Sequence, residues 1–249
     1  MAEYRKDYLL DKKVKMYQKE DGYKTSSDAV LIASLVDNLS DEAKILDVGS
    51  GCGGISLCLA YRFPKAKIYG FELQAELVEL SNLNAKENRF SNLQYICHNI
   101  KDKKTPLPAN SFEHVITNPP YEKNGTKSPN ESKALAHNQE FSLEKWLNFC
   151  LKMLKPYGFL YLIHRAQALD EILNILQKKA GNICIVPIYS RAGQAAKRVM
   201  IMAQKTSKAP LKILPPLVVH TQNGHTKAAE QILRDGKSFF EATMPNMDR

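Results

Sequence analysis

Short apolar runs alternate with longer segments of helical periodicity along most of the chain. Apolar runs bounded by turn residues predict strands, and apolar residues three or four positions apart predict helices. The predicted strands cover 44–48, 67–72, 93–99, the run before Asn118, 159–164, 183–189 and 197–204. The predicted helices cover 29–36, 55–62, 74–89, 141–155 and 167–179. This alternation predicts an α/β fold with a mostly parallel, seven-stranded sheet.

The last two predicted strands are joined by Ser190–Ala196, which is too short for a helical crossover. They therefore form an antiparallel hairpin at the carboxyl-terminal side of the sheet. Pro187 lacks a backbone donor and predicts that its strand lies at an edge. Gly181 is predicted to close the preceding helix, and Pro156–Gly158 to form a turn.

The two ends of the chain lack this pattern. Residues 1–21 are polar and charged, with tyrosines at 4, 8 and 17, and predict an arm or a short irregular pairing. Ser26, Ser27 and Asp28 are good helix N-caps. The segment 205–249 is expected to be extended, with a short helix at Thr226–Arg234 and a loose tail over the last dozen residues. We therefore expect one domain over 1–249, with a core at 22–204 and an extension at 205–249.

A glycine-rich turn, Gly49-Ser50-Gly51-Cys52-Gly53-Gly54, lies between the first predicted strand of the sheet and its helix. Glycines there allow a tight turn and close backbone approach to a ligand. Glu72 ends the next strand, where a carboxylate can bind ribose hydroxyls and repel a phosphorylated sugar. Asp47 precedes the first glycine, which is more typical of an adenosyl-cofactor loop than of an NAD loop. Asn99 is expected to end the third strand, where its side chain either contacts a cofactor adenine or forms a turn.

Asn118-Pro119-Pro120-Tyr121 follows a buried strand. The two prolines remove backbone donors and stop the strand at a stiff corner. The Asn118 side-chain oxygen and the Pro119 carbonyl can accept both N–H bonds of a conjugated amine. Neither group ionises at neutral pH, so this is positioning and electrostatic preorganisation rather than acid–base catalysis. Tyr121 offers a ring on which a planar base can stack. The loop at 122–140, with Lys123, Lys127 and Lys133, is expected to be a lid or substrate loop, or to be disordered.

Composition and charge limit the class of protein and the kinds of molecule that it can bind. Hydrophobic residues make up 44% and charged residues 24% of the 249 residues, as in ordinary soluble domains. No apolar run is long enough to cross a bilayer, and the amino terminus lacks a signal-peptide core. The five cysteines have no paired spacing and no histidine partner, which predicts free thiols in a reducing cytoplasm and no metal site. The net charge of +9 favours a polyanionic partner.

Together these motifs resemble the bacterial tRNA adenine-N6-methyltransferases that modify position 37 of a valine tRNA. The resemblance covers about residues 22–236, including Gly22–Leu31, Leu46–Gly53, Glu72, Asn118–Tyr121, His164-Arg165, Arg191–Arg198 and Leu214–His220. It implies a Rossmann-like class I methyltransferase, S-adenosylmethionine as cofactor, tRNA as partner and a monomer without metal. It implies catalytic roles for Asn118, Pro119, Pro120 and Tyr121. The implied cofactor contacts are Asp47, Gly49, Gly51, Gly53, Glu72, Leu73, Asn99, Ile100 and Asn118. The implied RNA contacts are Arg165, Arg191, Lys197 and Arg198. Asn99 departs from the aspartate of the family pattern, although its oxygen can still accept from an adenine amine.

Three alternatives share some of these features. Enzymes that methylate a release-factor glutamine on N5 use the same proline corner but carry a helical domain before it. Only about forty residues precede the first sheet strand here, which disfavours them. Guanine-N2 methylation of ribosomal RNA is the second alternative. A degenerate fold that only binds RNA is the third, and the presence of Asn118 and Glu72 argues against it.

Overall fold

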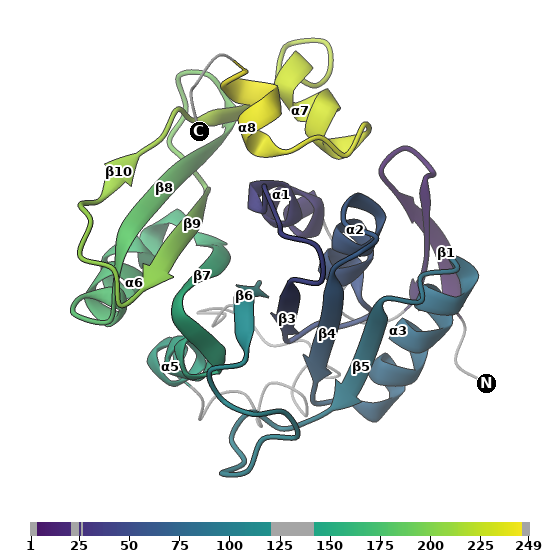
Figure 1. Cartoon of the computed structure of the whole chain (residues 1–249). Helices are drawn as coiled ribbons and strands as arrows, with labels where there is room; N and C mark the ends of the chain where they lie inside the picture. The colour runs from purple at the N-terminus through teal and green to yellow at the C-terminus, as the bar shows by residue number, and fades with distance from the viewer. Residues whose placement is uncertain (1–3, 21–24, 26, 121–141, 246–249) are drawn as a thin grey trace, which may run out of the picture.

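The computed structural model describes residues 4–20, 25, 27–120 and 142–245, and its centre is a nine-stranded sheet (Figure 1). The order along the sheet is β10-β8-β9-β7-β6-β3-β4-β5, with β11 beside β8. The strands are β3 (Lys44–Val48), β4 (Lys67–Glu72), β5 (Leu93–Cys97), β6 (Phe112–Thr117), β7 (Leu154–Arg165), β8 (Ala180–Arg191), β9 (Arg198–Lys205), β10 (Lys212–Ile213) and β11 (Leu217–His220).

The predicted topology is confirmed in its main features. Strands β3 to β7 pair in parallel, and β9 lies antiparallel between β7 and β8. All seven predicted strands are present. Two short strands that the sequence analysis missed, β10 and β11, extend the sheet beyond β8 in parallel.

The prediction that Pro187 marks an edge strand is wrong. Strand β10 pairs with β8 before Pro187, at Cys184 and Ile185, and β11 pairs with it after Pro187, beginning at Ile188. The pairing is interrupted at Pro187, which has no backbone N–H to donate. The segment between β10 and β11 passes this gap and contains Pro215-Pro216. Pro187 therefore divides the pairing along this side of β8 into two parts and does not make β8 an edge strand.

Helices cover both faces of the sheet, and two apolar clusters mark these faces. The helices are α1 (Ser27–Leu35), α2 (Gly54–Arg62), α3 (Ala75–Glu87), α5 (Leu143–Met153), α6 (Leu169–Leu176), α7 (Lys227–Leu233) and α8 (Phe239–Thr243). Successive side chains of β3 point to opposite faces of the sheet. Ile45 therefore packs into the cluster with α1 and α2, while Leu46 and Val48 pack into the cluster with α5 and α6. Figure 1 shows α5 and α6 near β7, with α7 and α8 above α1. No described helix is long and apolar enough to span a membrane.

Several local predictions need correction. Gly181 does not cap a helix but pairs with Gln204 inside β8, and a Cβ there would lie 2.5 Å from the Ser207 carbonyl oxygen. Pro156–Gly158 belongs to an irregular stretch of β7, where the register with β6 shifts between Leu154 and Phe159. Position 181 is a glycine because another stretch of backbone approaches it closely, and Pro156–Gly158 is irregular because β7 has a bulge there. Neither feature has a distinctive local sequence signal.

The amino-terminal segment, expected to be an arm or a short irregular pairing, forms a regular pairing. It forms an antiparallel hairpin of β1 (Tyr4–Leu9) and β2 (Val14–Lys19). Val14 and Met16 are buried in the cluster with α1 and α2. The face with these apolar anchors also carries Arg5, Asp7 and Gln18, so the alternation of apolar and polar residues that marks a strand is weak here.

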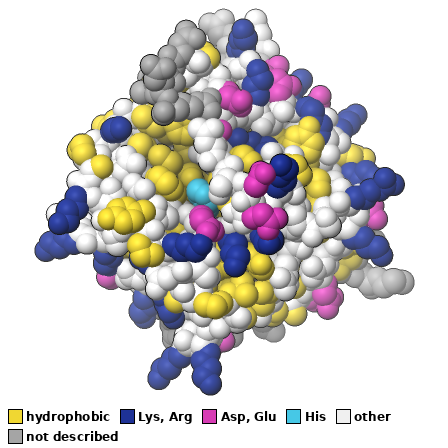
Figure 2. Space-filling model, in the orientation of Figure 1, with side chains coloured by type: hydrophobic (Ala, Val, Ile, Leu, Met, Phe, Trp, Pro, Cys, Tyr) yellow, Lys and Arg dark blue, Asp and Glu magenta, His cyan; other side chains and the backbone are white. Residues whose placement is uncertain are grey.

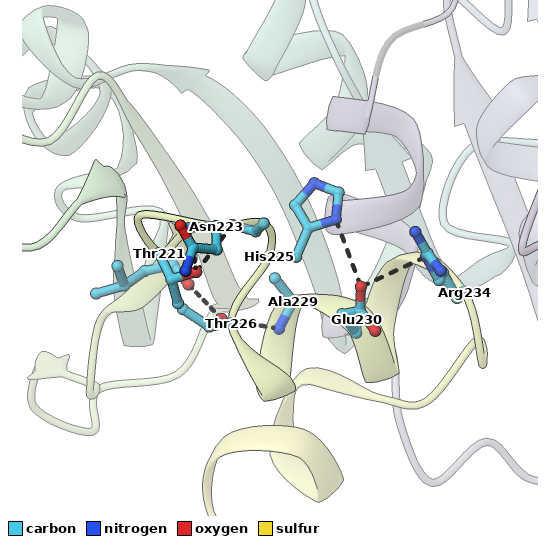
Figure 3. Close-up of polar contacts among 9 residues, drawn as sticks. Thr221, Asn223, His225, Thr226, Ala229, Glu230 and Arg234 are labelled. Carbon is cyan, nitrogen blue, oxygen red and sulfur yellow. Dashed lines mark hydrogen bonds and ion pairs between the residues drawn. The ribbon is translucent and has the colours of Figure 1, made fainter.

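The carboxyl-terminal segment is also more ordered than expected. Thr226 is the N-cap of α7, and its Oγ accepts from the Ala229 N–H at 3.2 Å. In the last turn, Arg234 Nε lies 3.6 Å from Glu230 Oε1 (Figure 3). Instead of a loose tail, α8 begins with a capping box between Ser238 and Glu241. Phe239, fully buried, anchors this helix to the core.

Candidate active site

The glycine-rich turn after β3 has three glycines in the left-handed region of backbone space. Gly49, Gly51 and Gly53 have φ of 75°, 57° and 92°, which side chains rarely tolerate. A Cβ on Gly49 would lie 2.8 Å from the Trp146 ring, and one on Gly53 would lie 2.5 Å from the Tyr95 hydroxyl. A Cβ on Gly51 would meet no described atom within 4 Å. The outer glycines therefore make room for the protein's own rings, while the middle one faces open space.

Glu72 holds this turn from the neighbouring strand. Its carboxylate is 8% exposed and accepts from the Gly51 N–H at 2.9 Å and from the Gln74 N–H at 3.0 Å. Each oxygen accepts one of these bonds, and a carboxylate has about four acceptor sites. Glu72 therefore retains acceptor capacity for ribose hydroxyls beside the open side of Gly51. The donor and acceptor set fits the adenosyl part of S-adenosylmethionine.

Asp47 lies deeper than a residue that lines an open site. It is fully buried, and Oδ2 accepts from the Ser56 hydroxyl at 2.6 Å. Among the described residues, Oδ1 has no hydrogen-bond partner. Burial, with a smaller contribution from the negative charge of Glu72, raises the pKa of Asp47 to about 7. Its hydrogen bond with Ser56 joins β3 to α2, and direct cofactor contact stays a prediction.

This raised pKa predicts a specific pH dependence of stability. The carboxyl has its ordinary pKa of 3.8 in the unfolded chain and a pKa of about 7 in the folded protein. Between these values the folded state binds more protons, so the free energy of unfolding should fall as pH rises and level off above 7. The loss amounts to roughly 4 kcal/mol for three pKa units. Denaturant titrations at several pH values should show a shallower decline for Asp47→Asn, and parallel curves for the two proteins would contradict the raised pKa.

The sheet register places the proline corner beside the glycine turn. Val48 pairs with Phe71 on one side and with Thr117 on the other. The next residues, Glu72, Gly49 and Asn118, therefore follow one another across the carboxyl edge of three adjacent parallel strands. Ligands of open α/β sheets bind at this edge. The structure thus brings Gly49 and Asn118 together, although they are 69 positions apart in the sequence.

Two hydrogen bonds of Thr117 hold the strand end just before the proline corner. The Thr117 hydroxyl donates to the Val48 carbonyl at 2.8 Å and accepts from Trp146 Nε1 at 2.9 Å. The same tryptophan ring lies against Gly49. Asn118 is half-buried, Pro119 is buried and Pro120 is exposed, while Tyr121 lies outside the described residues. The sequence analysis placed Trp146 only within the predicted helix 141–155 and gave Thr117 no role.

Trp146→Phe separates these two functions of the ring. Phenylalanine keeps an aromatic ring near Gly49 but cannot donate to Thr117. We expect a loss of about 1 kcal/mol in the free energy of unfolding and a several-fold lower kcat with little change in cofactor affinity. Thr117→Ser, which keeps the hydroxyl, serves as the matched control. Unchanged stability and turnover in Trp146→Phe would show that this hydrogen bond does not fix the corner.

The remaining predicted cofactor residues lie farther along this edge. Strand β5 ends at Cys97, so Asn99 does not end the strand as expected. Its Oδ1 accepts from the Lys101 N–H at 3.0 Å, and its carbonyl accepts from the Asp102 N–H at 2.9 Å. Asn99 therefore forms a turn, which is one of the two roles predicted for it. Its side-chain oxygen can also accept a hydrogen bond from a ligand. Leu73 is exposed and Ile100 is half-buried. The contacts of all three with a cofactor stay predictions.

The predicted RNA contacts lie at the ends of the antiparallel strands. Arg165 and Arg198 are opposite each other in the β7–β9 pair, Arg191 ends β8, and Lys197 precedes β9. Strand β7 runs parallel to β6, so its end, with Arg165, lies at the same edge as Asn118. Arg198 Nε donates to Asp28 Oδ2 at 3.2 Å. Helix α1 begins at Ser27, so Asp28 lies inside its first turn and is not the N-cap that the sequence favoured. The structure describes none of Lys123, Lys127 and Lys133, which fall within 121–141.

Comparisons with known proteins agree with this geometry. The sequence profile of the family called Methyltransferase small domain matches residues 25–182. A tRNA1(Val) (adenine(37)-N6)-methyltransferase from Shewanella frigidimarina is 28% identical over an alignment of 239 residues, and the match covers 92% of each chain. A protein of the same name from Vibrio campbellii is 31% identical over 140 residues, 56% of this chain and 57% of that one. The crystal structure of a predicted O-methyltransferase, Atu636 from Agrobacterium tumefaciens, has a TM-score of 0.71 and 26% identity, covering 84% of this chain and 96% of that one.

The fold, with the glycine turn and the proline corner at one sheet edge, is that of a class I methyltransferase. The chain belongs to the Methyltransferase small domain family, whose profile covers more than half of it. The protein is therefore an enzyme that transfers a methyl group. Within the described part of the chain, no group of three or more His, Cys, Asp or Glu residues could hold a metal ion.

Proposed function

We propose that this protein uses S-adenosylmethionine to methylate N6 of an adenine in tRNA, at position 37 of a valine tRNA. The observation that carries this proposal is the register that aligns Glu72, Gly49 and Asn118 across adjacent strand ends. The substrate is supported by the relative from Shewanella frigidimarina, whose name specifies that reaction and whose match spans 92% of both chains.

The chain's own residues bind and orient the reactants. The Gly51 backbone and the Glu72 carboxylate hold the adenosyl part of the cofactor, which supplies the methyl group. The Asn118 oxygen and the Pro119 carbonyl accept the two N–H bonds of the adenine amine and direct the nitrogen toward that methyl group. Because the corner is stiff and both acceptors are neutral, the gain comes from positioning. Tyr121, just after the corner, supplies a stacking surface for the base.

A labelling assay tests the reaction. The protein is incubated with radiolabelled S-adenosylmethionine and, separately, with total tRNA, ribosomal RNA and a translation release factor. Label in tRNA, recovered as N6-methyladenosine at position 37 after nuclease digestion, is the expected result. Label on a release-factor glutamine or on guanine N2 of ribosomal RNA would establish one of the alternative functions. Heat-inactivated protein is the control.

The basic residues of the antiparallel turn should contact the tRNA backbone. Arg191→Glu combined with Lys197→Glu reverses two exposed charges without touching a described packing contact. We expect a higher KM for tRNA and a flatter dependence of binding on salt, with a salt slope smaller by about 1.5 to 2. Cofactor affinity, measured by calorimetry, should stay constant. Wild-type tRNA binding and salt slope in this variant would remove the turn from the RNA interface.

A further inference from the structure

The amino-terminal hairpin has one face on which tyrosines and lysines alternate. Its register pairs Tyr4 with Lys19, Lys6 with Tyr17, and Tyr8 with Lys15. Opposite residues of an antiparallel pair share a face, as do residues two positions apart on one strand. These six side chains therefore form one surface in which every cross-strand pair combines a ring with a cation. We call this surface the Tyr–Lys face.

The Tyr–Lys face points away from the core. The opposite face carries Val14, Met16 and Gln18, which are at most 4% exposed. On the Tyr–Lys face, Tyr4 and Tyr8 are 47% and 44% exposed. Lys6 and Lys15 are exposed, and Tyr17 and Lys19 are half-buried. Packing accounts for the inner face but not for two large exposed rings.

Helix α3 holds this surface rigidly. Asn84 accepts from the Tyr17 N–H at 2.7 Å and donates to the Tyr17 carbonyl at 2.9 Å. Asn88, one turn later, accepts from the Lys15 N–H at 2.8 Å and donates to the Lys15 carbonyl at 2.6 Å. The two side-chain amides thus take the place of a neighbouring strand. They satisfy the free edge of β2 and fix the direction of its side chains.

The same contacts connect the surface to the active site. Asn84 also donates to the Cys52 carbonyl of the glycine turn at 2.9 Å. Lys19 forms an ion pair with Glu76 in the first turn of α3, which starts just after Glu72. The open end of the hairpin therefore lies near the sheet edge that holds the cofactor and substrate residues. Figure 1 shows the hairpin beside α2 and α3.

This surface carries three lysines and no acidic side chain of its own, and the acidic side chains near it, Glu76 at Lys19 and Glu87 at Lys6, belong to α3. Glu76 balances Lys19, whereas Lys6 Nζ lies 5.6 Å and 5.8 Å from the ring centroids of Tyr8 and Tyr17. Lys15 is the other exposed cation of this face. Basic side chains occur over the whole surface in Figure 2, and several lie at the right margin, where Figure 1 places the hairpin and α3. Exposed rings interleaved with cations suit single-stranded nucleic acid, whose bases stack and whose phosphates need counter-charges.

We propose that the Tyr–Lys face binds single-stranded loop nucleotides of the tRNA substrate, with bases on Tyr4 and Tyr8 and phosphates at Lys6 and Lys15. This inference rests on the proposed function, because it assigns a second contact to the same substrate. A second copy of the chain is a poorer occupant, because each copy carries a net charge of +9 and would bring lysines against lysines. A loop that extends past the target adenine can instead reach both the active site and the hairpin.

The test compares Lys6→Gln/Lys15→Gln with a matched control, Lys208→Gln/Lys212→Gln. The control removes two exposed lysines at or next to β10, the opposite end of the sheet from β5. Fluorescence anisotropy with labelled tRNA should give roughly tenfold weaker binding for the hairpin pair, with a salt slope smaller by about 1.4. The control pair should change the Kd less than twofold. Equal losses for both pairs would overturn the proposal, because they would reflect net charge alone.

A second pair of variants tests stacking. Tyr8→Ala should weaken tRNA binding by roughly tenfold, while Tyr8→Phe, which keeps the ring, should bind as wild type does. Equal binding by Tyr8→Ala and wild type would overturn the stacking contact, and thermal unfolding confirms that each variant is folded. tRNA binding and tRNA methylation are measured in separate assays. If wild type binds tRNA without methylating it, the proposed function fails, and the hairpin is still judged by its binding loss. Dissociation of a wild-type dimer by Lys6→Gln/Lys15→Gln would assign the face to a second copy and overturn RNA binding there.

Discussion

Replacing Asn118 by alanine should reduce methyl transfer at least about 100-fold while cofactor affinity stays nearly constant. The residue follows Thr117, which is paired with Val48, so its side chain lies next to the glycine turn. Removing one preorganised hydrogen-bonding group from an active site typically costs a factor of 100 to 1,000 in kcat. Single-turnover kinetics with tRNA measure the chemical step, and calorimetry with S-adenosylmethionine measures binding.

The matched control for this variant is Asn148→Ala. Asn148 lies on α5, where its Oδ1 accepts from Lys179 Nζ at 2.8 Å, so an amide is removed far from the sheet edge. We expect wild-type turnover from the control. Loss of both cofactor binding and thermal stability in Asn118→Ala would show instead that Asn118 mainly maintains the strand end.

The fold could be predicted from sequence because its signals are local. Each buried strand is a short apolar run with turn residues around it, and the 190–196 connection is too short for a crossover. The two-residue strand β10 and the bulge in β7 escaped because they depend on pairing with distant segments. A short pairing at 4–19 was one of two expectations, but its regularity escaped because its outer face consists of lysine and tyrosine, which lowers the contrast between its two faces.

The candidate site was predictable to the extent that strand ends mark it. Glycines after one strand, an acid after the next and Asn-Pro-Pro after a third all lie at one edge by topology alone. The supporting contacts were not predictable. Trp146 reaches Thr117 and Gly49 from a helix that follows the corner by more than twenty residues, and Asn84 joins β2 to the glycine turn. Such contacts depend on packing between elements, which neither periodicity nor a short motif encodes.

Glu72→Ala should weaken S-adenosylmethionine binding by about 1.5–3 kcal/mol, a factor of roughly 10 to 150. The carboxylate contributes in two ways. It accepts from the Gly51 N–H and so shapes the open part of the turn, and its remaining acceptor sites are available to the ribose hydroxyls. Glu72→Gln separates these contributions, because the amide keeps one acceptor oxygen but loses the charge, and its affinity should fall between those of wild type and Glu72→Ala.

Glu113→Ala is the control that makes this result specific. Glu113 is also a strand carboxylate that accepts from a backbone N–H, that of Lys44, and from a lysine, but it lies near the amino end of β6. Because that end is opposite the proposed site, its loss should leave cofactor affinity unchanged. Calorimetry on all three variants, with thermal unfolding as the test of folding, decides between the possibilities. Equal cofactor affinity in folded Glu72→Ala and wild type would remove Glu72 from the site, and equal losses at Glu72 and Glu113 would point to a general effect on the sheet.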